Sequence, residues 1–149
     1  LSVSYQVIRH TGKYRHKTNN RRHMKKPKPK RQDHEQPECI EQWGWKYHHT
    51  GIPTSRIMPG EHYLPELKFY VSGFDISPYG VEWMRFEKDS PVHPLIQSVP
   101  HLAFEVTDLD YELANRKLNV ISYPTNPSEG VRVAMIEHNS APIELIEFS

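Results

Sequence analysis

The second half of the chain alternates apolar and polar residues in short runs, a pattern typical of β-strands, and one helical pattern interrupts it. Residues 99–106 (VPHLAFEV) predict a strand with His101 and Glu105 on one face and apolar residues on the other. Residues 108–118 (DLDYELANRKL) predict a helix, because Thr107 or Asp108 can cap its start and basic residues occupy its last turn. Further strands are predicted at 120–123, 131–138 and 142–148, with a turn-rich loop at 124–130. The predicted order is β-α-β-β-β.

The first half contains similar strands but more proline and glycine. Three β-type runs predict strands at residues 46–53, 67–74 and 81–87. Residues 54–65 are broken by Pro and Gly and cannot form a long helix. Residues 90–98 predict a connector with at most one helical turn. We therefore expect the first half to have a shortened helix or none.

A strand with histidine opens each half, and a strand with glutamate closes it. The opening motifs are HTGI at 49–52 and HLAF at 101–104, and the closing motifs are VEWMRF at 81–86 and IELIEF at 143–148. The separation from His49 to Glu82 is 33 residues, and that from His101 to Glu144 is 43 residues. The ten missing residues fall where the second half has its helix. The pattern indicates an internal repeat in which each half contributes one histidine and one glutamate in the same way.

These motifs resemble the vicinal-oxygen-chelate superfamily, which includes glyoxalase I and bleomycin-resistance proteins. The matching segments are HTGI at 49–52, HLAFEVTDLD at 101–110 and APIELIEF at 141–148. The resemblance implies an α+β fold in which two paired βαβββ-type modules form a cupped mixed sheet. The modules would span about 43–98 and 99–149 of a single domain at 43–149, and the first would have a shortened or missing helix.

The resemblance also implies a metal site. Carried over by position, the four ligands of the superfamily fall on His49, Glu82, His101 and Glu144. Two imidazoles and two carboxylates suit one divalent ion such as Zn, Ni, Mn or Fe, with a position left open. Of the adjacent histidines at 48 and 49, the motif selects His49, and His48 would then face away from the cavity. A three-ligand set without Glu82 is the alternative, and it matches the geometry of non-haem iron enzymes.

The implied activity is that of a metal-dependent lyase or isomerase. In the glyoxalase and epimerase branches, a Lewis-acidic ion and a carboxylate move a proton on a small oxo-acid or hydroxy-acid substrate, which can be a thiol conjugate. Glu82, Glu144 and Glu105 are the candidate proton carriers. Arg132 and Trp83 are candidate substrate contacts. The alternatives are a non-catalytic protein that binds a small molecule, and a three-ligand dioxygenase or thiol transferase.

Charge separates the N-terminal segment from the rest of the chain. Residues 1–32 contain 11 Lys/Arg and no Asp/Glu, whereas residues 33–149 carry a net charge of −10. We interpret residues 1–42 as a basic tail that is disordered, a targeting segment, or sequence upstream of the protein proper, since Met24 lies within them. Nucleic-acid binding by this tail is disfavoured, because the acidic remainder would repel a polyanion.

Other features of the sequence bear on the location, the ligands and the oligomeric state of the protein. No apolar run approaches the roughly 20 residues that cross a membrane. The single cysteine, Cys39, cannot form an internal disulfide, and we expect a cytoplasmic protein. No phosphate loop or dinucleotide fingerprint is present. We also expect a homodimer, because a shortened first module leaves a strand edge or pocket side that a partner could cover.

Overall fold

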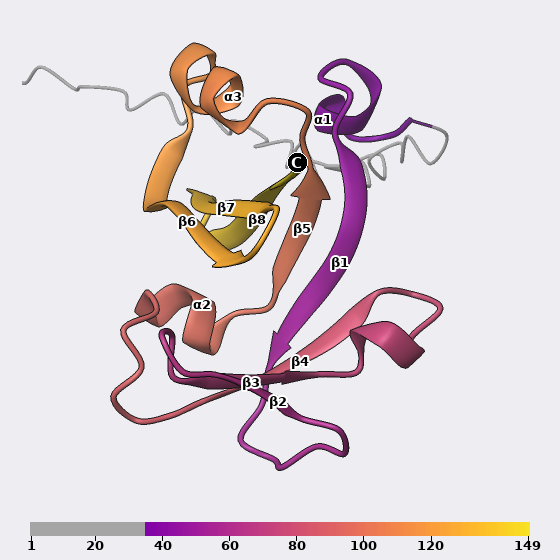
Figure 1. The fold of residues 1–149 in the computed structure, drawn as a ribbon. Helices are drawn as coiled ribbons and strands as arrows, with labels where there is room; N and C mark the ends of the chain where they lie inside the picture. The colour runs from indigo at the N-terminus through magenta and orange to yellow at the C-terminus, as the bar shows by residue number, and fades with distance from the viewer. Residues whose placement is uncertain (1–34) are drawn as a thin grey trace, which may run out of the picture. The chain divides into compact units, whose positions relative to one another are not determined.

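A computed structural model describes residues 35–149, and the predictions made for residues 1–34 lie outside these described residues. The described part forms one eight-stranded mixed sheet with a few short helices (Figure 1). The strands are β1 (Lys46–Pro53), β2 (His62–Leu64), β3 (Phe69–Ser72), β4 (Val81–Phe86), β5 (His101–Glu105), β6 (Asn119–Ser128), β7 (Val131–His138) and β8 (Ala141–Phe148). The helices are α1 (Glu38–Glu41), α2 (Pro94–Ser98), α3 (Leu109–Asn115) and the 3-10 helix η1 (Phe74–Ile76). Within the described range, no helix is long and apolar enough to cross a membrane.

The strand order confirms the predicted pair of modules. The sheet runs β2-β3-β4-β1-β5-β8-β7-β6, so that each half places its first strand beside its last. In each module the first and last strands are parallel, as β1 pairs with β4 and β5 pairs with β8. The two modules join where β1 and β5 pair in antiparallel orientation (Figure 1). The fold is therefore the α+β cupped sheet that the repeat predicted.

The first module has no helix between its first two strands. Residues 54–61 form only bends and turns there, whereas the second module places α3 between β5 and β6. Of the two possible caps, Thr107 and Asp108, the structure uses Asp108, whose carboxylate accepts a hydrogen bond of 2.8 Å from the backbone N–H of Tyr111. The helical turn expected before the second module is α2, which packs Ile96 into the interior.

Several local details differ from the predictions. The helix predicted at 108–118 ends at Asn115, because Arg116 adopts an extended conformation, so the basic residues expected in its last turn lie beyond it. Residues 124–128, predicted as loop, continue β6, because they pair with β7 through a series of register shifts that accommodate Pro124 and Pro127. The strand predicted at 67–74 is confined to β3, because Gly73 takes a positive φ of 93° and leads into η1. The short strand β2 was missed, since its three residues lie within a Pro- and Gly-broken stretch.

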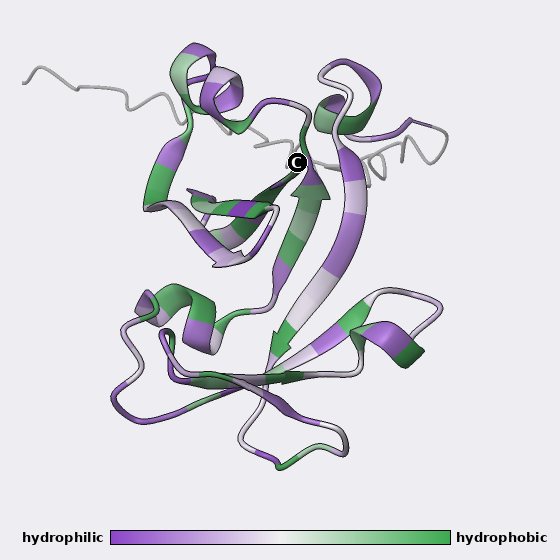
Figure 2. Cartoon of the chain, in the orientation of Figure 1, coloured by the Kyte–Doolittle hydropathy of each residue, from purple (hydrophilic) through white to green (hydrophobic). Residues whose placement is uncertain are grey.

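Two apolar clusters lie on opposite faces of the sheet. The outer cluster of the second module lies beneath α3 and α1, and its members include Trp45, Phe104, Leu109 and Leu145. Cys39 and Ile40 of α1 also pack against it, although α1 precedes the predicted domain start at residue 43. The inner cluster, on the concave side, comprises Phe69, Met84, Ile96 and Met135. Hydrophobic residues recur along β5 and α2 in Figure 2, whereas much of the surface of α3 is hydrophilic.

Candidate metal centre

Both histidines and one glutamate of the predicted ligand set meet at the junction of the modules. The ligand atoms of His49, His101 and Glu144 all lie within 4.8 Å of one another. The Nε2 atom of His101 lies 3.0 Å from Glu144 Oε2, and the Nε2 atom of His49 lies 3.7 Å from the same oxygen. The two Nε2 atoms are 3.3 Å apart. The histidine side chains are buried, with 1% of His101 and 5% of His49 exposed.

These separations fit a metal ion at the centre of the group. In a tetrahedral site with metal–nitrogen distances near 2 Å, neighbouring ligand atoms lie about 3.3 Å apart. The three distances of 3.0, 3.3 and 3.7 Å fall around that value. The donor set of two imidazoles and a carboxylate is also one that Zn, Fe, Mn and Ni accept. The residues present therefore fit the divalent ion that the sequence predicted.

Glu82 lies beside this group without completing it. Its Oε1 atom is 3.8 Å from His49 Nε2, and its side chain is mostly buried in the same cavity. Among the described residues, the cluster of three that could hold a metal does not include it. The structure therefore brings three predicted ligands together and places the fourth next to them.

Burial shifts the pKa values of two of these groups. Burial, reinforced by the nearby charge of Glu144, raises the pKa of Glu82 to about 7. Burial also lowers the pKa of His49 to about 4, although Glu144 acts in the opposite direction. In the metal-free protein near neutral pH, His49 is therefore uncharged and Glu82 is protonated in a large share of molecules. A divalent cation would favour the ionised carboxylate and the neutral imidazole, which are the forms that bind metal.

The register of the sheet explains why the ligands meet. Gly51 lies opposite Glu82 in the first module, and Ala103 lies opposite Glu144 in the second, so each glutamate is level with the residue two positions after its histidine. Across the junction, Gly51 pairs with His101, and Ala103 pairs with His49. The two modules therefore deliver equivalent side chains about a pseudo-twofold axis.

Two small residues make room for the imidazoles, and sequence reasoning missed their role. A Cβ atom on Gly51 would lie only 2.1 Å from Cε1 of the His101 ring. Ala103, the equivalent residue opposite His49, is fully buried. The signal was present in the sequence, because the third residues of HTGI and HLAF are both small.

The predicted orientation of His48 is wrong. A β-bulge occurs in β1, where the pairing with β5 shifts register between Tyr47 and His49. As a result both neighbouring histidines line the cavity, whereas a regular strand would turn them to opposite faces. The Nδ1 atoms of His48 and His49 lie 2.9 Å apart.

The ligand group opens into a cavity of about 650 Å³ on the concave side of the sheet. Most of its wall is apolar, including Leu67, Phe69, Val71, Met84, Val92, Ile96, Ile121, Val131, Val133, Met135, Ile146 and Phe148. Besides the metal ligands and Glu82, the polar side chains of the wall belong to His48, His93, Ser122 and Thr125. Its lining contains no Lys or Arg among the described residues.

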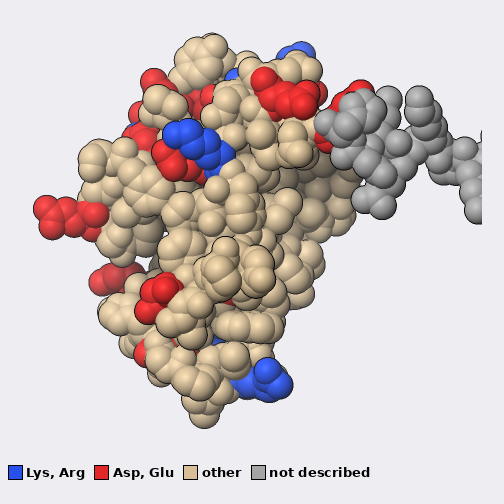
Figure 3. All heavy atoms as spheres, turned by 90° about the vertical axis from the view of Figure 1, so that its right-hand side faces the viewer, with Lys and Arg blue, Asp and Glu red and all other residues tan. Residues whose placement is uncertain are grey.

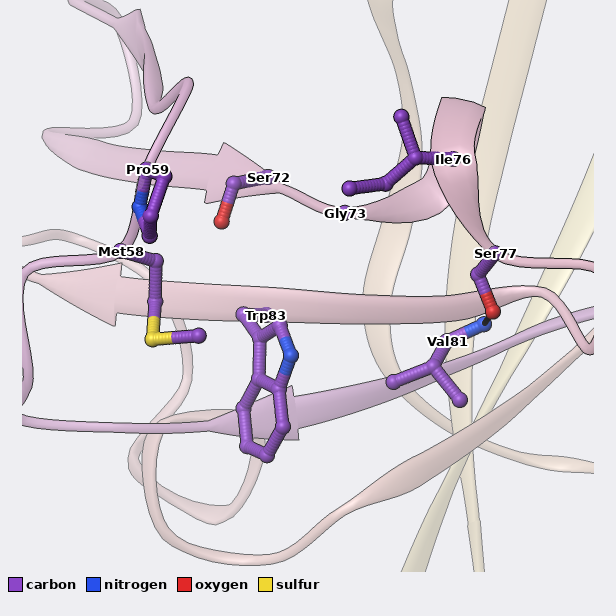
Figure 4. A pocket seen from close by; sticks show the side chains of 8 residues that line it. All are labelled: Met58, Pro59, Ser72, Gly73, Ile76, Ser77, Val81 and Trp83. Atoms are coloured by element: carbon purple, nitrogen blue, oxygen red, sulfur yellow. Dashed lines mark hydrogen bonds between the residues drawn. The ribbon is translucent and has the colours of Figure 1, made fainter.

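The structure does not bring the other three predicted site residues into this cavity. Trp83 lies on the outer face of β4 and lines a separate pocket of about 300 Å³ with Met58 and Ile76 (Figure 4). Arg132 lies on the outer face of β7, where it forms ion pairs with Asp110 and Glu147. Alternation along a strand explains both placements, because Glu82 and Val131 face the cavity and their next neighbours face away.

Glu105 shares the face of His101 in strand alternation but lies at the far end of β5. Its carboxylate is 3.7 Å from Lys46 Nζ, and it is absent from the cavity lining. The predicted role of Glu105 in proton transfer therefore has no support from its position.

Solved structures with a similar fold are known. A hypothetical protein from Bacillus halodurans C-125 matches with a TM-score of 0.55 and 20% sequence identity, over 70% of this chain and 95% of that chain. Methylmalonyl-CoA epimerase from Mycobacterium tuberculosis matches with a TM-score of 0.50 and 17% identity, over 70% of this chain and 88% of that chain. No protein-family model matches the sequence. No curated protein matches it either. At these identities the comparisons show that the chain shares the fold of these proteins.

Proposed function

We propose that the protein is a metal-dependent lyase or isomerase of the vicinal-oxygen-chelate superfamily that moves a proton at the carbon beside a carbonyl group. The observation that carries the proposal is the convergence of His49, His101 and Glu144, with Glu82 alongside, on one apolar cavity. The fold shared with a methylmalonyl-CoA epimerase supports the same reading.

The ion, Glu82 and the apolar wall of the cavity would have different roles in the proposed proton transfer. A bound divalent ion supplies Lewis acidity to the oxygens of a substrate. Glu82 is the best-placed proton carrier, because its carboxylate lines the cavity 3.8 Å from His49 Nε2 and lies outside the three-residue ligand cluster. The apolar wall of the cavity excludes water and so strengthens the electrostatic interactions at the reacting carbon.

The wall of the cavity favours a particular substrate class. Because no Lys or Arg lines it in the described part of the chain, an anionic group would find no cationic side chain there. The substrate that fits best presents two neighbouring oxygens to the ligand group and an apolar substituent to the wall. A thiol conjugate of such a compound would keep its charged carrier outside the cavity.

Elemental analysis after dialysis against metal-free buffer is the first test. We expect one equivalent of divalent metal in the wild type, and loss of that metal in His101→Ala and in Glu144→Ala. Glu137→Gln is the matched control, because this carboxylate lies on β7 outside the cavity lining. A folded wild type that takes up none of Zn, Ni, Mn or Fe would refute the metal-dependent activity.

Proton transfer itself is measured by solvent exchange. The metal-loaded protein is incubated in D₂O with a panel of 2-oxo acids, thioesters of 2-oxo acids, and 2-hydroxy ketones, and the proton beside the carbonyl is followed by NMR. We expect deuterium incorporation into at least one apolar member, and a loss of at least 100-fold in Glu82→Gln.

A three-ligand centre is the second candidate, and it is favoured by the absence of Glu82 from the tight cluster. Metal affinity distinguishes the two. If Glu82 is a ligand, Glu82→Gln weakens metal binding as Glu144→Gln does. If it is a proton carrier only, Glu82→Gln retains the metal and loses exchange activity.

We also propose that the protein forms a homodimer through the outer face of the first module. Helix α3 covers this face in the second module, but in the first module Ile76, Tyr79 and Ile57 remain exposed beside the Trp83 pocket. The surface in Figure 3 is largely uncharged between a few acidic and basic groups. Exposed apolar patches of this kind are typical of interaction surfaces.

A further inference from the structure

The β-bulge in β1 places a third histidine against the predicted metal centre. Nδ1 of His48 lies 2.9 Å from Nδ1 of His49, on the side of the His49 ring away from the Nε2 atom that faces Glu144. The ring of His48 stacks on Phe74, with centroids 4.9 Å apart and planes 11° apart. It also contacts Phe148 at 5.4 Å. The contact between the two histidines is therefore held by packing on the His48 ring.

In the metal-free protein, the contacts of the ring nitrogens determine the tautomers of His101 and His49. Nδ1 of His101 is buried and has no hydrogen-bond partner, whereas its Nε2 lies 3.0 Å from Glu144 Oε2. A buried unpaired N–H is costly, so the proton of His101 resides on Nε2 and is donated to Glu144. That proton also faces Nε2 of His49 at 3.3 Å. A second N–H at this position would oppose the first, so Nε2 of His49 carries a lone pair.

The remaining proton of His49 must then reside on Nδ1. In that tautomer the contact of 2.9 Å between the two Nδ1 atoms has His49 as the donor, and His48 would accept the proton and carry its own on Nε2. The second module has no counterpart of this contact, because Pro100 precedes His101 where His48 precedes His49. The two histidine ligands therefore occupy equivalent positions in the sheet but differ at Nδ1. Nδ1 of His49 contacts His48, whereas Nδ1 of His101 has no hydrogen-bond partner.

We propose that His48 is a positioning residue that holds His49 in its Nδ1–H tautomer and so presents the Nε2 lone pair to the metal centre. The role in metal binding rests on the function proposed above, whereas the tautomer is a property of the metal-free protein. Outer hydrogen bonds of this kind orient histidine ligands and raise their basicity. His49 is thus a ligand preformed by its own strand, whereas His101 must move its proton before it can bind an ion.

The tautomer is tested first, on the metal-free wild-type protein. Long-range ¹H–¹⁵N correlation spectra of the imidazole rings distinguish a protonated from an unprotonated ring nitrogen. We expect His49 to carry its proton on Nδ1 and His48 to carry its proton on Nε2. A proton on Nε2 of His49, or averaging between both nitrogens, would overturn the proposal. This readout needs no metal, so it stands even if the protein binds none.

Metal affinity is tested next, by zinc competition with a chromophoric chelator. His48→Leu removes the acceptor, and we expect it to weaken zinc binding by about 10- to 100-fold. His48→Asn can place an amide oxygen near the lost Nδ1 and should recover most of that affinity. His62→Ala, which removes an exposed histidine outside the cavity lining, should match the wild type.

The outcomes separate the two proposals. If His48→Asn is folded and binds zinc as weakly as His48→Leu, His48 acts by packing and the positioning role is wrong. If His48→Leu binds zinc as tightly as the wild type, the positioning role is also wrong. If the wild type binds no metal while His49 shows the Nδ1–H tautomer, the proposed function fails and the role of His48 in fixing the tautomer survives.

Discussion

Gly51→Ala perturbs the centre through a single methyl group. The backbone of Gly51 does not have a positive φ, so alanine is allowed there and any cost is steric. The added Cβ would lie 2.1 Å from Cε1, 2.6 Å from Nε2 and 2.7 Å from Nδ1 of the His101 ring. The ring must therefore retreat by roughly 1.3 Å before it reaches an ordinary contact distance of 3.4 Å. His101 is 1% exposed, so little space is available for that movement.

Overpacking of this kind costs about 1–3 kcal/mol of folding free energy. With a urea dependence of about 1–2 kcal/mol per molar, the unfolding midpoint of the metal-free protein should fall by roughly 1 M. Displacing the ring also separates the two Nε2 atoms, so zinc affinity should fall by at least tenfold. Urea unfolding, followed by tryptophan fluorescence, and zinc competition measure the two effects separately.

A double-mutant cycle decides whether the ring is the cause. In a His101→Ala background the ring is absent, so Gly51→Ala should cost little and the coupling between the two changes should be about 1–3 kcal/mol. If Gly51→Ala lowers the free energy of unfolding by the same amount in both backgrounds, the destabilisation comes from the backbone at residue 51 and not from the His101 ring. In that case a small residue at position 51 is not required to accommodate the His101 ring.

Three further predictions concern pH, metal and assembly. Because the pKa of Glu82 is raised to about 7 in the folded state, this carboxyl holds its proton more fully in the folded metal-free protein than in the unfolded chain between pH 4.5 and 7. Glu82 alone would lower the urea stability by about 2 kcal/mol as the pH rises through that window, whereas the lowered pKa of His49, about 4, acts in the opposite direction over nearly the same range. The unfolding free energy of Glu82→Gln should therefore rise by about 2 kcal/mol relative to that of the wild type between pH 4.5 and 7. Zinc at 100 times its Kd should stabilise the wild type by about 2.7 kcal/mol in thermal unfolding and leave His101→Ala unaffected. Light scattering should show a dimer for the wild type and a folded monomer for Ile76→Asp; a dimeric variant would contradict the proposed interface.

Much of this site follows from the sequence. The matched motifs around His49 and His101 predicted two modules, and the resemblance assigned the ligand positions, three of which lie together in the structure. Strict alternation would also have placed Trp83 on the face opposite Glu82. Equally, Arg132 lies between two residues that face the cavity and could have been assigned to the outer face.

Other features depend on tertiary pairing and could not be predicted locally. The bulge at His48 exists because β1 must keep register with β5 at Gly51 and also at Tyr47. No residue within β1 marks that shift. The length of β6 also depends on tertiary pairing. Pro124 and Pro127 indicate a loop in the sequence alone, but in the fold this segment pairs irregularly with β7 and extends the strand.

The four acidic and imidazole groups at the centre come in equal shares from the two modules, with His49 and Glu82 in the first and His101 and Glu144 in the second. Neither module can surround an ion alone, and within residues 35–149 the two modules are joined by strand pairing only between β1 and β5. A chain divided in the connector around α2 would thus yield two fragments that each carry half of the donor set. The pairing of β1 with β5 and the apolar clusters that contain residues of both modules would favour reassociation of such fragments. If the proposed centre binds an ion, that ion would add to the assembly as well as to the chemistry.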